Sequence, residues 1–230
     1  MYFLSWDYEK DLPTCSVFYE KESYLSKTQQ QEEEQVVNRL KELCEVFNSI
    51  TEQINQNGFP DLCPSNYKYP EKEYPLYCLA PEKNIGIIEI ECDKIIGGNW
   101  ANIPFAEING GYPKPRKFVD LLRGYLNLND QLKNTRDSIP PIPVYKIFDD
   151  YFCDEGNHRL YVSRLLKFET IKAEVLEFDY FTFLQNSYLH TTSLLTYLAY
   201  PVGEKGYTQL NEINADEIEQ YKKLKEKYKG

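Results

Sequence analysis

The clearest hydrophobic pattern in the chain covers residues 30–57, where apolar positions recur at the spacing of one helix face. Acidic residues crowd the first turns, and Gly58 and Pro60 follow the last one, as expected for a helix with defined ends. Such an apolar stripe must be covered, either by the rest of the chain or by self-association with a second copy. The stripe consists of Val36, Val37, Leu40, Leu43, Cys44, Phe47, Ile50 and Ile54.

Shorter patterns further along the chain predict strands. Residues 85–92 alternate imperfectly between apolar and polar side chains, which predicts a strand entering the core. Residues 143–148 and 151–153 are rich in β-branched and aromatic side chains and flank an acidic turn, so they predict two short strands. Residues 160–168 return to helical spacing.

Two further helices and one ambiguous segment complete the pattern. Residues 118–132 place apolar groups on one side of a helix, and a second helix begins near Asn214 or Asp216. The aromatic segment 178–201 fits either a helix or a strand, and its His190 is interpreted as a hydrogen-bonded structural residue. Together, the elements predict an α+β fold.

Two segments show no clear period. Residues 59–84 interleave prolines with tyrosines, which predicts an irregular connector whose tyrosines either pack or bind a partner, with packing favoured. Residues 97–115 form a long glycine-rich loop around Trp100, Phe105 and Glu107. This loop is either a binding loop over a nearby site or a surface excursion held by Trp100.

Candidate chemistry is concentrated in one heptapeptide, which lies between the strand 151–153 and the helix 160–168. The backbone N–H groups and the positive dipole end of a helix N-terminus favour an anion such as phosphate in such a loop. An imidazole and a guanidinium add donors suited to phosphate oxygens. The heptapeptide is Asp154-Glu155-Gly156-Asn157-His158-Arg159-Leu160.

The same region resembles the ParB/sulfiredoxin superfamily. The likeness rests on Tyr151–Leu160, which contains the family's acid-Gly-Asn-His-Arg core, and on the later segments Val162–Arg164 and Glu169–Val175. Glu155 stands where the family usually has aspartate, with Asp154 one place earlier. The match is most specific over residues 141–175, and it extends to about 85–178 if Asp93–Gly98 is the opening segment.

This resemblance implies a small mixed sheet with helices and a site for a nucleotide. Members of the superfamily include proteins that use CTP, ATP or ADP, and some reported nucleases. On that basis Gly156, Asn157, His158 and Arg159 would bind phosphates, and His158 would donate to phosphate or act as a general acid. The acids Glu155 and Asp154 would polarise a nucleophile or hold Mg²⁺. A structural alternative is that Arg159 pairs with one of these acids and locks the loop.

Two other functions remain open. A DNA-binding protein or nuclease of ParB-like type would use the same loop with the basic segment Lys114–Lys117, although a net charge of −10 disfavours binding to DNA phosphates. A non-catalytic interaction module would act through the helix 30–57. The lysine-rich end of the chain is interpreted as the solvated face of a helix. The leading prediction is a nucleotide hydrolase, a phosphotransferase or a nucleotide-gated module.

Composition limits the remaining classes. The 6 cysteines form no Cys-x-x-Cys pair and only 2 histidines are present, so no structural metal site is expected and the thiols are expected to be reduced. Cys153, beside the motif, is interpreted as a core-facing strand residue. No apolar run is long enough to span a bilayer, and a soluble, cytoplasmic protein without membrane contacts is expected.

The predicted domain organisation has four parts. Residues 1–58 form an N-terminal segment with the long helix, and residues 59–84 form the connector. The ParB/sulfiredoxin-like domain covers residues 85–178, and a C-terminal extension covers residues 179–230.

Overall fold

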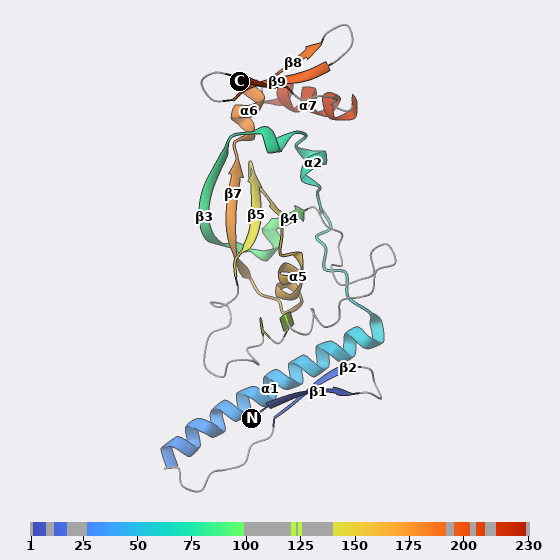
Figure 1. Cartoon of the computed structure of the whole chain (residues 1–230). Coiled ribbons are helices and arrows are strands. Elements are labelled where there is room, and N and C mark those ends of the chain that lie inside the picture. The colour runs from blue at the N-terminus through green and yellow to red at the C-terminus, as the bar shows by residue number, and fades with distance from the viewer. Residues whose placement is uncertain are drawn as a thin grey trace. The chain divides into compact units, whose positions relative to one another are not determined.

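The structure is a computed structural model that describes residues 2–7, 12–17, 27–98, 121–122, 124–125, 140–191, 196–202, 206–209 and 215–228 (Figure 1). Its contacts group into two compact units, which are described separately. The first unit draws on Met1–Cys63, Ala101–Pro140 and His158–Lys167. The second draws on Pro64–Trp100, Pro141–Asn157 and Phe168–Gly230. The four-part division predicted from the sequence stays a prediction.

In the first unit, a hairpin packs along a long helix. Strands β1 (Tyr2–Asp7) and β2 (Leu12–Val17) pair antiparallel, and β2 contacts helix α1 (Lys27–Asn57) (Figure 1). The predicted stripe of α1 is confirmed, because Val37, Leu40, Cys44 and Phe47 are all buried. The spacing of these residues puts them on one helix face. Part of the stripe is therefore covered by β2 of the same chain.

Helix α1 is fastened to β2 at Cys15. The backbone N–H of Cys15 donates to Oδ1 of Asn48 at 2.7 Å, and Nδ2 of Asn48 donates to the carbonyl of Cys15 at 2.9 Å. Cys15 and Cys44 also form a disulfide, so the expectation that all thiols are reduced is wrong for this pair. Sequence spacing gave no signal, because the pairing depends on how β2 lies on α1. Disulfides are rare in cytosolic proteins, and the predicted cytoplasmic location stays a prediction.

The second unit is built on a five-stranded mixed sheet with the order β3-β7-β5-β6-β4 (Figure 1). The β5–β6 and β3–β7 pairs are antiparallel, whereas β5–β7 and β4–β6 are parallel. The α+β class is therefore confirmed. The strands are β3 (Glu82–Glu91), β4 (Ile95–Gly98), β5 (Ile142–Ile147), β6 (Asp150–Cys153) and β7 (Thr170–Phe178).

The ambiguous segment after β7 contains both kinds of structure. It forms α6 (Tyr180–Asn186), β8 (Tyr188–Thr191) and β9 (Thr196–Val202), and the latter two join β10 (Gly206–Gln209) in an antiparallel sheet. The predicted C-terminal helix is confirmed as α7 (Ala215–Lys227). Its first turn carries acids and its last turn lysines, which complements the helix dipole.

Strand β3 differs from the sequence prediction. The segment is a strand, but it lies at the edge of the sheet and does not enter the core. Ile90 is the only buried residue of the strand. Sequence alternation cannot distinguish an edge strand from a central one, because the difference depends on which strand pairs with it. The exposed isoleucines of β3 are therefore a surface feature.

The tyrosine-rich segment packs into the core of the second unit, as the packing interpretation predicted. It contains the short helices α2 (Pro70–Glu73) and η1 (Tyr77–Leu79). The ring of Tyr77 meets Phe178 edge-on at 5.1 Å, and the hydroxyl of Tyr74 donates to Asp150 at 2.8 Å. Lys68 pairs with the same carboxylate at 2.7 Å. These contacts fix the segment to β6 and β7.

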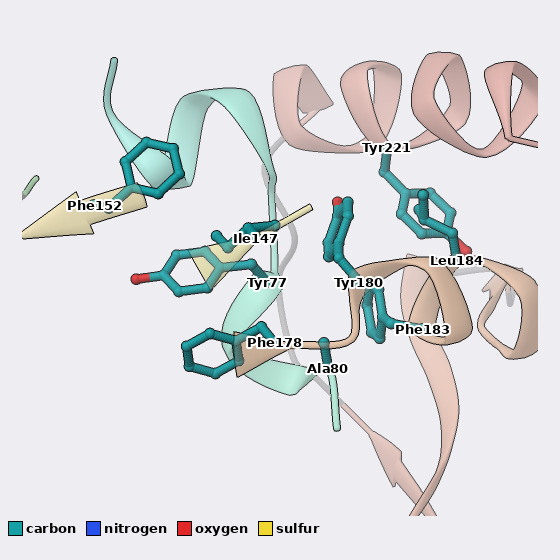
Figure 2. Packing of buried hydrophobic residues seen from close by; sticks show 9 residues of the cluster. All are labelled: Tyr77, Ala80, Ile147, Phe152, Phe178, Tyr180, Phe183, Leu184 and Tyr221. Carbon is teal, nitrogen blue, oxygen red and sulfur yellow. The ribbon is translucent and has the colours of Figure 1, made fainter. Parts of the chain in front are cut away.

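An aromatic cluster fills this core (Figure 2). Tyr180 and Phe183 of α6 stack with ring centroids 5.4 Å apart, and Tyr221 of α7 contacts Phe183 edge-on. The hydroxyl groups are also satisfied, since Tyr180 donates to the carbonyl of Pro75 at 2.7 Å. Buried tyrosines usually find such partners. The cluster consists of Tyr77, Ala80, Ile147, Phe152, Phe178, Tyr180, Phe183, Leu184 and Tyr221.

Gly97 and Gly98 belong to strand β4, so the loop that the sequence predicted over residues 97–115 does not begin at these glycines. A Cβ atom on Gly97 would lie 2.1 Å from the carbonyl oxygen of Lys68 and 2.8 Å from the ring of Phe152. One on Gly98 would lie 2.4 Å from the carbonyl oxygen of Cys153. Close packing therefore requires these two glycines. The remaining part of the predicted loop lies outside the described residues.

We expect Gly97→Ala to lower the free energy of unfolding by about 1–3 kcal/mol, because the added methyl group meets backbone that cannot move aside. The measurement is chemical denaturation followed by circular dichroism. Gly124→Ala is the control, because its added Cβ would meet nothing within 4 Å. In a helix, alanine is favoured over glycine, so the control is expected to be neutral or stabilising. Equal effects of the two substitutions would contradict the packing role of Gly97.

Candidate functional site

The predicted strand-to-helix loop is present. Strand β6 ends at Cys153, and helix α5 (Asn157–Leu165) begins four residues later. Gly156 turns the chain between them with φ of 91°. L-residues rarely adopt this conformation, so the turn needs glycine at this position. The motif crosses the boundary between the two units after Asn157, and each part is described by itself.

In the second unit, Asp154 is attached to the sheet. Its backbone N–H donates to the carbonyl of Pro143 at 3.1 Å, which continues the β5–β6 pairing past the end of β6. Its carboxylate accepts a hydrogen bond from the hydroxyl of Tyr145 on β5. Burial raises the pKa of Tyr145, and the hydrogen bond to Asp154 raises it further. Tyr145 is therefore held in its neutral, donating form.

Glu155 is placed differently from its neighbour. Its side chain is exposed, whereas Asp154 is half-buried. The carbonyl oxygen of Glu155 accepts a hydrogen bond from the thiol of Cys153 at 3.2 Å. Cys153 is buried, which confirms that it is a core-facing strand residue. The two adjacent acids therefore have different environments, and Glu155 is the more exposed of the two.

In the first unit, Arg159 is anchored near the start of α5. Its Nη1 atom donates to the carbonyl oxygen of Pro140 at 2.6 Å. A guanidinium carries five N–H donors, of which this bond uses one. His158 is half-buried, and its Nε2 atom is buried. The structure thus gives Arg159 a defined position instead of a freely moving side chain.

Helix α5 is itself held firmly within the first unit. The hydroxyl of Tyr161 donates to the carbonyl of Pro60 at 2.7 Å, and its ring meets Phe59 edge-on at 6.3 Å. Leu160, Val162 and Ser163 are buried. A helix supported in this way keeps the N–H groups of its first turn in fixed positions, which is what an anion site requires.

Two contributors to the loop geometry were missed by the sequence analysis. Tyr145 was assigned only to a strand, and Pro140 was given no role. Both act through the hydrogen bonds described above. The role of Tyr145 follows from its position in β5. Tyr145 lies opposite Phe152 in the β5–β6 register, and Phe152 is two residues before Asp154. That register is known only once the strands are paired.

The acids also bear on a metal ion. Mg²⁺ is usually bound through one or two carboxylates together with substrate phosphates. Asp154 and Glu155 are adjacent carboxylates of this kind, and a bound Mg²⁺ would neutralise phosphate charge. No group of three or more His, Cys, Asp or Glu side chains within the described part of the chain is placed to hold a metal ion.

Some predicted features lie beyond the described residues. These are the basic segment Lys114–Lys117, most of the helix 118–132 and the side chain of His190. No described helix is both long enough and apolar enough to cross a bilayer. No protein-family model matches the chain, and no curated protein is similar enough in sequence to match it. The function must therefore be argued from the site itself.

Proposed function

We propose that this chain is a ParB/sulfiredoxin-like protein that binds the phosphate groups of a nucleotide at residues 154–159. The observation that carries the proposal is the β6–Gly156–α5 junction. Gly156, with φ of 91°, directly precedes a helix that starts at Asn157. The first turn of a helix has N–H groups without intrahelical partners, and these groups and the helix dipole both favour an anion there.

The order of elements around the junction supports the same proposal. An antiparallel β5–β6 hairpin leads into α5, and β7 then returns parallel to β5. This strand, loop, helix and strand order is the one that the family resemblance implies for the segment 141–175. The resemblance rests on residue types, and the local geometry rests on backbone pairing.

The side chains are assigned complementary roles. Arg159 provides donors for phosphate oxygens, and the fixed fork of a guanidinium suits them better than an ammonium group does. Glu155, which is exposed, either holds Mg²⁺ or polarises the attacking group. The hydrogen bond from Tyr145 keeps the neighbouring carboxylate of Asp154 in one orientation. Such an arrangement suits phosphoryl transfer, nucleotide hydrolysis or a nucleotide-dependent switch.

The first test is a thermal-shift panel of ATP, ADP, CTP and GTP, each with and without Mg²⁺. A ligand present at about 100 times its Kd stabilises the native state by about 2.7 kcal/mol. For a chain of this length that corresponds to a Tm increase of about 5–10 °C. Adenosine, which lacks phosphates, is the control and is expected to give no shift. A shift of equal size with adenosine, or no shift with any nucleotide, would contradict a phosphate site.

A further inference from the structure

Among the described residues, no strand pairs with the outer edge of β3. It is ten residues long and lies at the end of the five-stranded sheet, with β7 as its partner on the other side. Three of its isoleucines are exposed: Ile85 by 37%, Ile87 by 63% and Ile88 by 36%. Long edge strands with exposed apolar side chains pair readily with another chain, and proteins usually protect them.

Only the beginning of this edge is protected. The register with β7 shifts between Asn84 and Gly86, and Gly86 has φ of 91°, so a bulge interrupts the strand there. Such bulges blunt an edge. From Gly86 to Glu91 the register with β7 is regular, and this stretch contains neither proline nor lysine. Six residues therefore remain able to accept a further strand.

The charges around this stretch are mostly acidic. Five acids and two lysines belong to its second half, to the residues directly after it, and to residues 169–175, which include its pairing partners on β7. The net charge of this set is −3. The acids are all exposed, and Glu91 is paired with Lys94 at 2.7 Å. The charged residues counted are Glu89, Glu91, Asp93, Glu169, Glu174, Lys94 and Lys172.

We propose that Gly86–Glu91 binds an extended basic peptide, which adds to the sheet as an antiparallel strand. Backbone hydrogen bonds would provide affinity and alternate side chains specificity. An apolar side chain would lie opposite Ile87, and lysines or arginines would lie opposite Glu89 and Glu91. A second copy of this chain fits less well, because self-pairing within Gly86–Glu91 places no basic residue opposite an acid.

The test uses fluorescence anisotropy on the full chain with two labelled peptides. The first, Thr-Lys-Val-Lys-Val-Val-Thr, places lysines opposite Glu91 and Glu89 in antiparallel pairing. In the second, glutamates replace the lysines. The wild-type protein is expected to bind the lysine peptide at least about tenfold more tightly, because each cross-strand charge pair changes from attractive to repulsive. Equal affinities for the two peptides would overturn the proposal.

A charge reversal separates strand pairing from general attraction. Glu89→Lys/Glu91→Lys is expected to reverse the peptide preference. The variant should fold, because the Glu91–Lys94 pair and the hydrogen bond from Thr170 to Glu89 are both exposed. A lysine at position 89 also lies opposite Lys172, and this like-charge pair costs about 1 kcal/mol or less. Glu71→Lys/Glu73→Lys, at exposed positions of α2, changes the net charge equally and is expected to keep the wild-type preference.

Two further results would overturn the proposal. The first is an equal loss of lysine-peptide binding in both double variants, which would indicate nonspecific charge attraction. The second is the detection of a dimer by light scattering, if Ile87→Lys dissociates this dimer and the lysine peptide does not. That dimer would assign the edge to a second copy of the chain.

Discussion

Replacing Phe183 by alanine is expected to lower the free energy of unfolding by about 3–5 kcal/mol, because it empties the centre of the aromatic cluster. The side chain is fully buried, between the stacked ring of Tyr180 and the edge-on ring of Tyr221 (Figure 2). These rings belong to helices that cannot close the cavity without moving apart from their other partners. For a chain of this length the corresponding fall in Tm is about 10 °C.

Phe181→Ala provides a matched control on the same helix. Phe181 is 47% exposed, so its removal costs little burial, and we expect a change of about 1 kcal/mol or less. Both variants can be compared by denaturant titration followed in the near-ultraviolet circular dichroism of tyrosine. If Phe183→Ala costs no more than Phe181→Ala, the aromatic cluster is not the core of the second unit.

Replacing Arg159 by alanine is expected to abolish the nucleotide-dependent rise in Tm. The side chain is the strongest phosphate donor of the proposed site, and alanine offers no replacement. The bond from its Nη1 atom to Pro140 is also lost, which should lower the stability of the unliganded protein by only about 1 kcal/mol. The two effects are separable, since one requires nucleotide and the other does not.

Lys167→Asn is the charge control for this experiment. Lys167 is exposed just after α5 and has φ of 56°, which asparagine tolerates better than most residues. The variant removes one positive charge without altering the start of the helix, and it is expected to keep the full nucleotide shift. A folded Arg159→Ala protein that still shows the wild-type shift would remove the phosphate site from this loop.

The elements that were predictable are those whose signal is local. The stripe of α1 was readable because residues three and four apart share a helix face. Val37, Leu40, Cys44 and Phe47 are buried, as that spacing predicts. The hairpin of β5 and β6 was readable because β-branched and aromatic runs flank a short acidic turn. All the residues that make up each of these patterns lie within about 30 consecutive positions.

Features that depend on distant partners were not predictable. The edge position of β3 depends on its pairing with β7, about 85 residues later in the chain. The tyrosine-rich segment was expected to be irregular, yet Tyr74 and Tyr77 reach rings more than 65 residues away, in β5, β7 and α6. No local period encodes such contacts, so the sequence could indicate their burial but not their partners.

The candidate site follows the same division. Gly156 and the start of α5 were predictable, because an acid-glycine-amide sequence between a strand and a helix indicates a turn and a helix start from neighbouring residues alone. The hydrogen bonds from Tyr145 to Asp154 and from Arg159 to Pro140 join residues 9 and 19 positions apart. They depend on the strand register and on the path of the chain before β5, which the residue types alone do not specify.

The most direct test of the phosphate site is a ¹H–¹⁵N NMR titration of the deuterated protein, of 27.1 kDa, with the nucleotide that gives the largest thermal shift. We expect the largest, saturable changes at the backbone amides of Gly156, Asn157 and His158 and at the guanidinium of Arg159. Inorganic phosphate should move the same amides at higher concentration. Saturable changes confined to other residues, with these amides unmoved, would contradict the account.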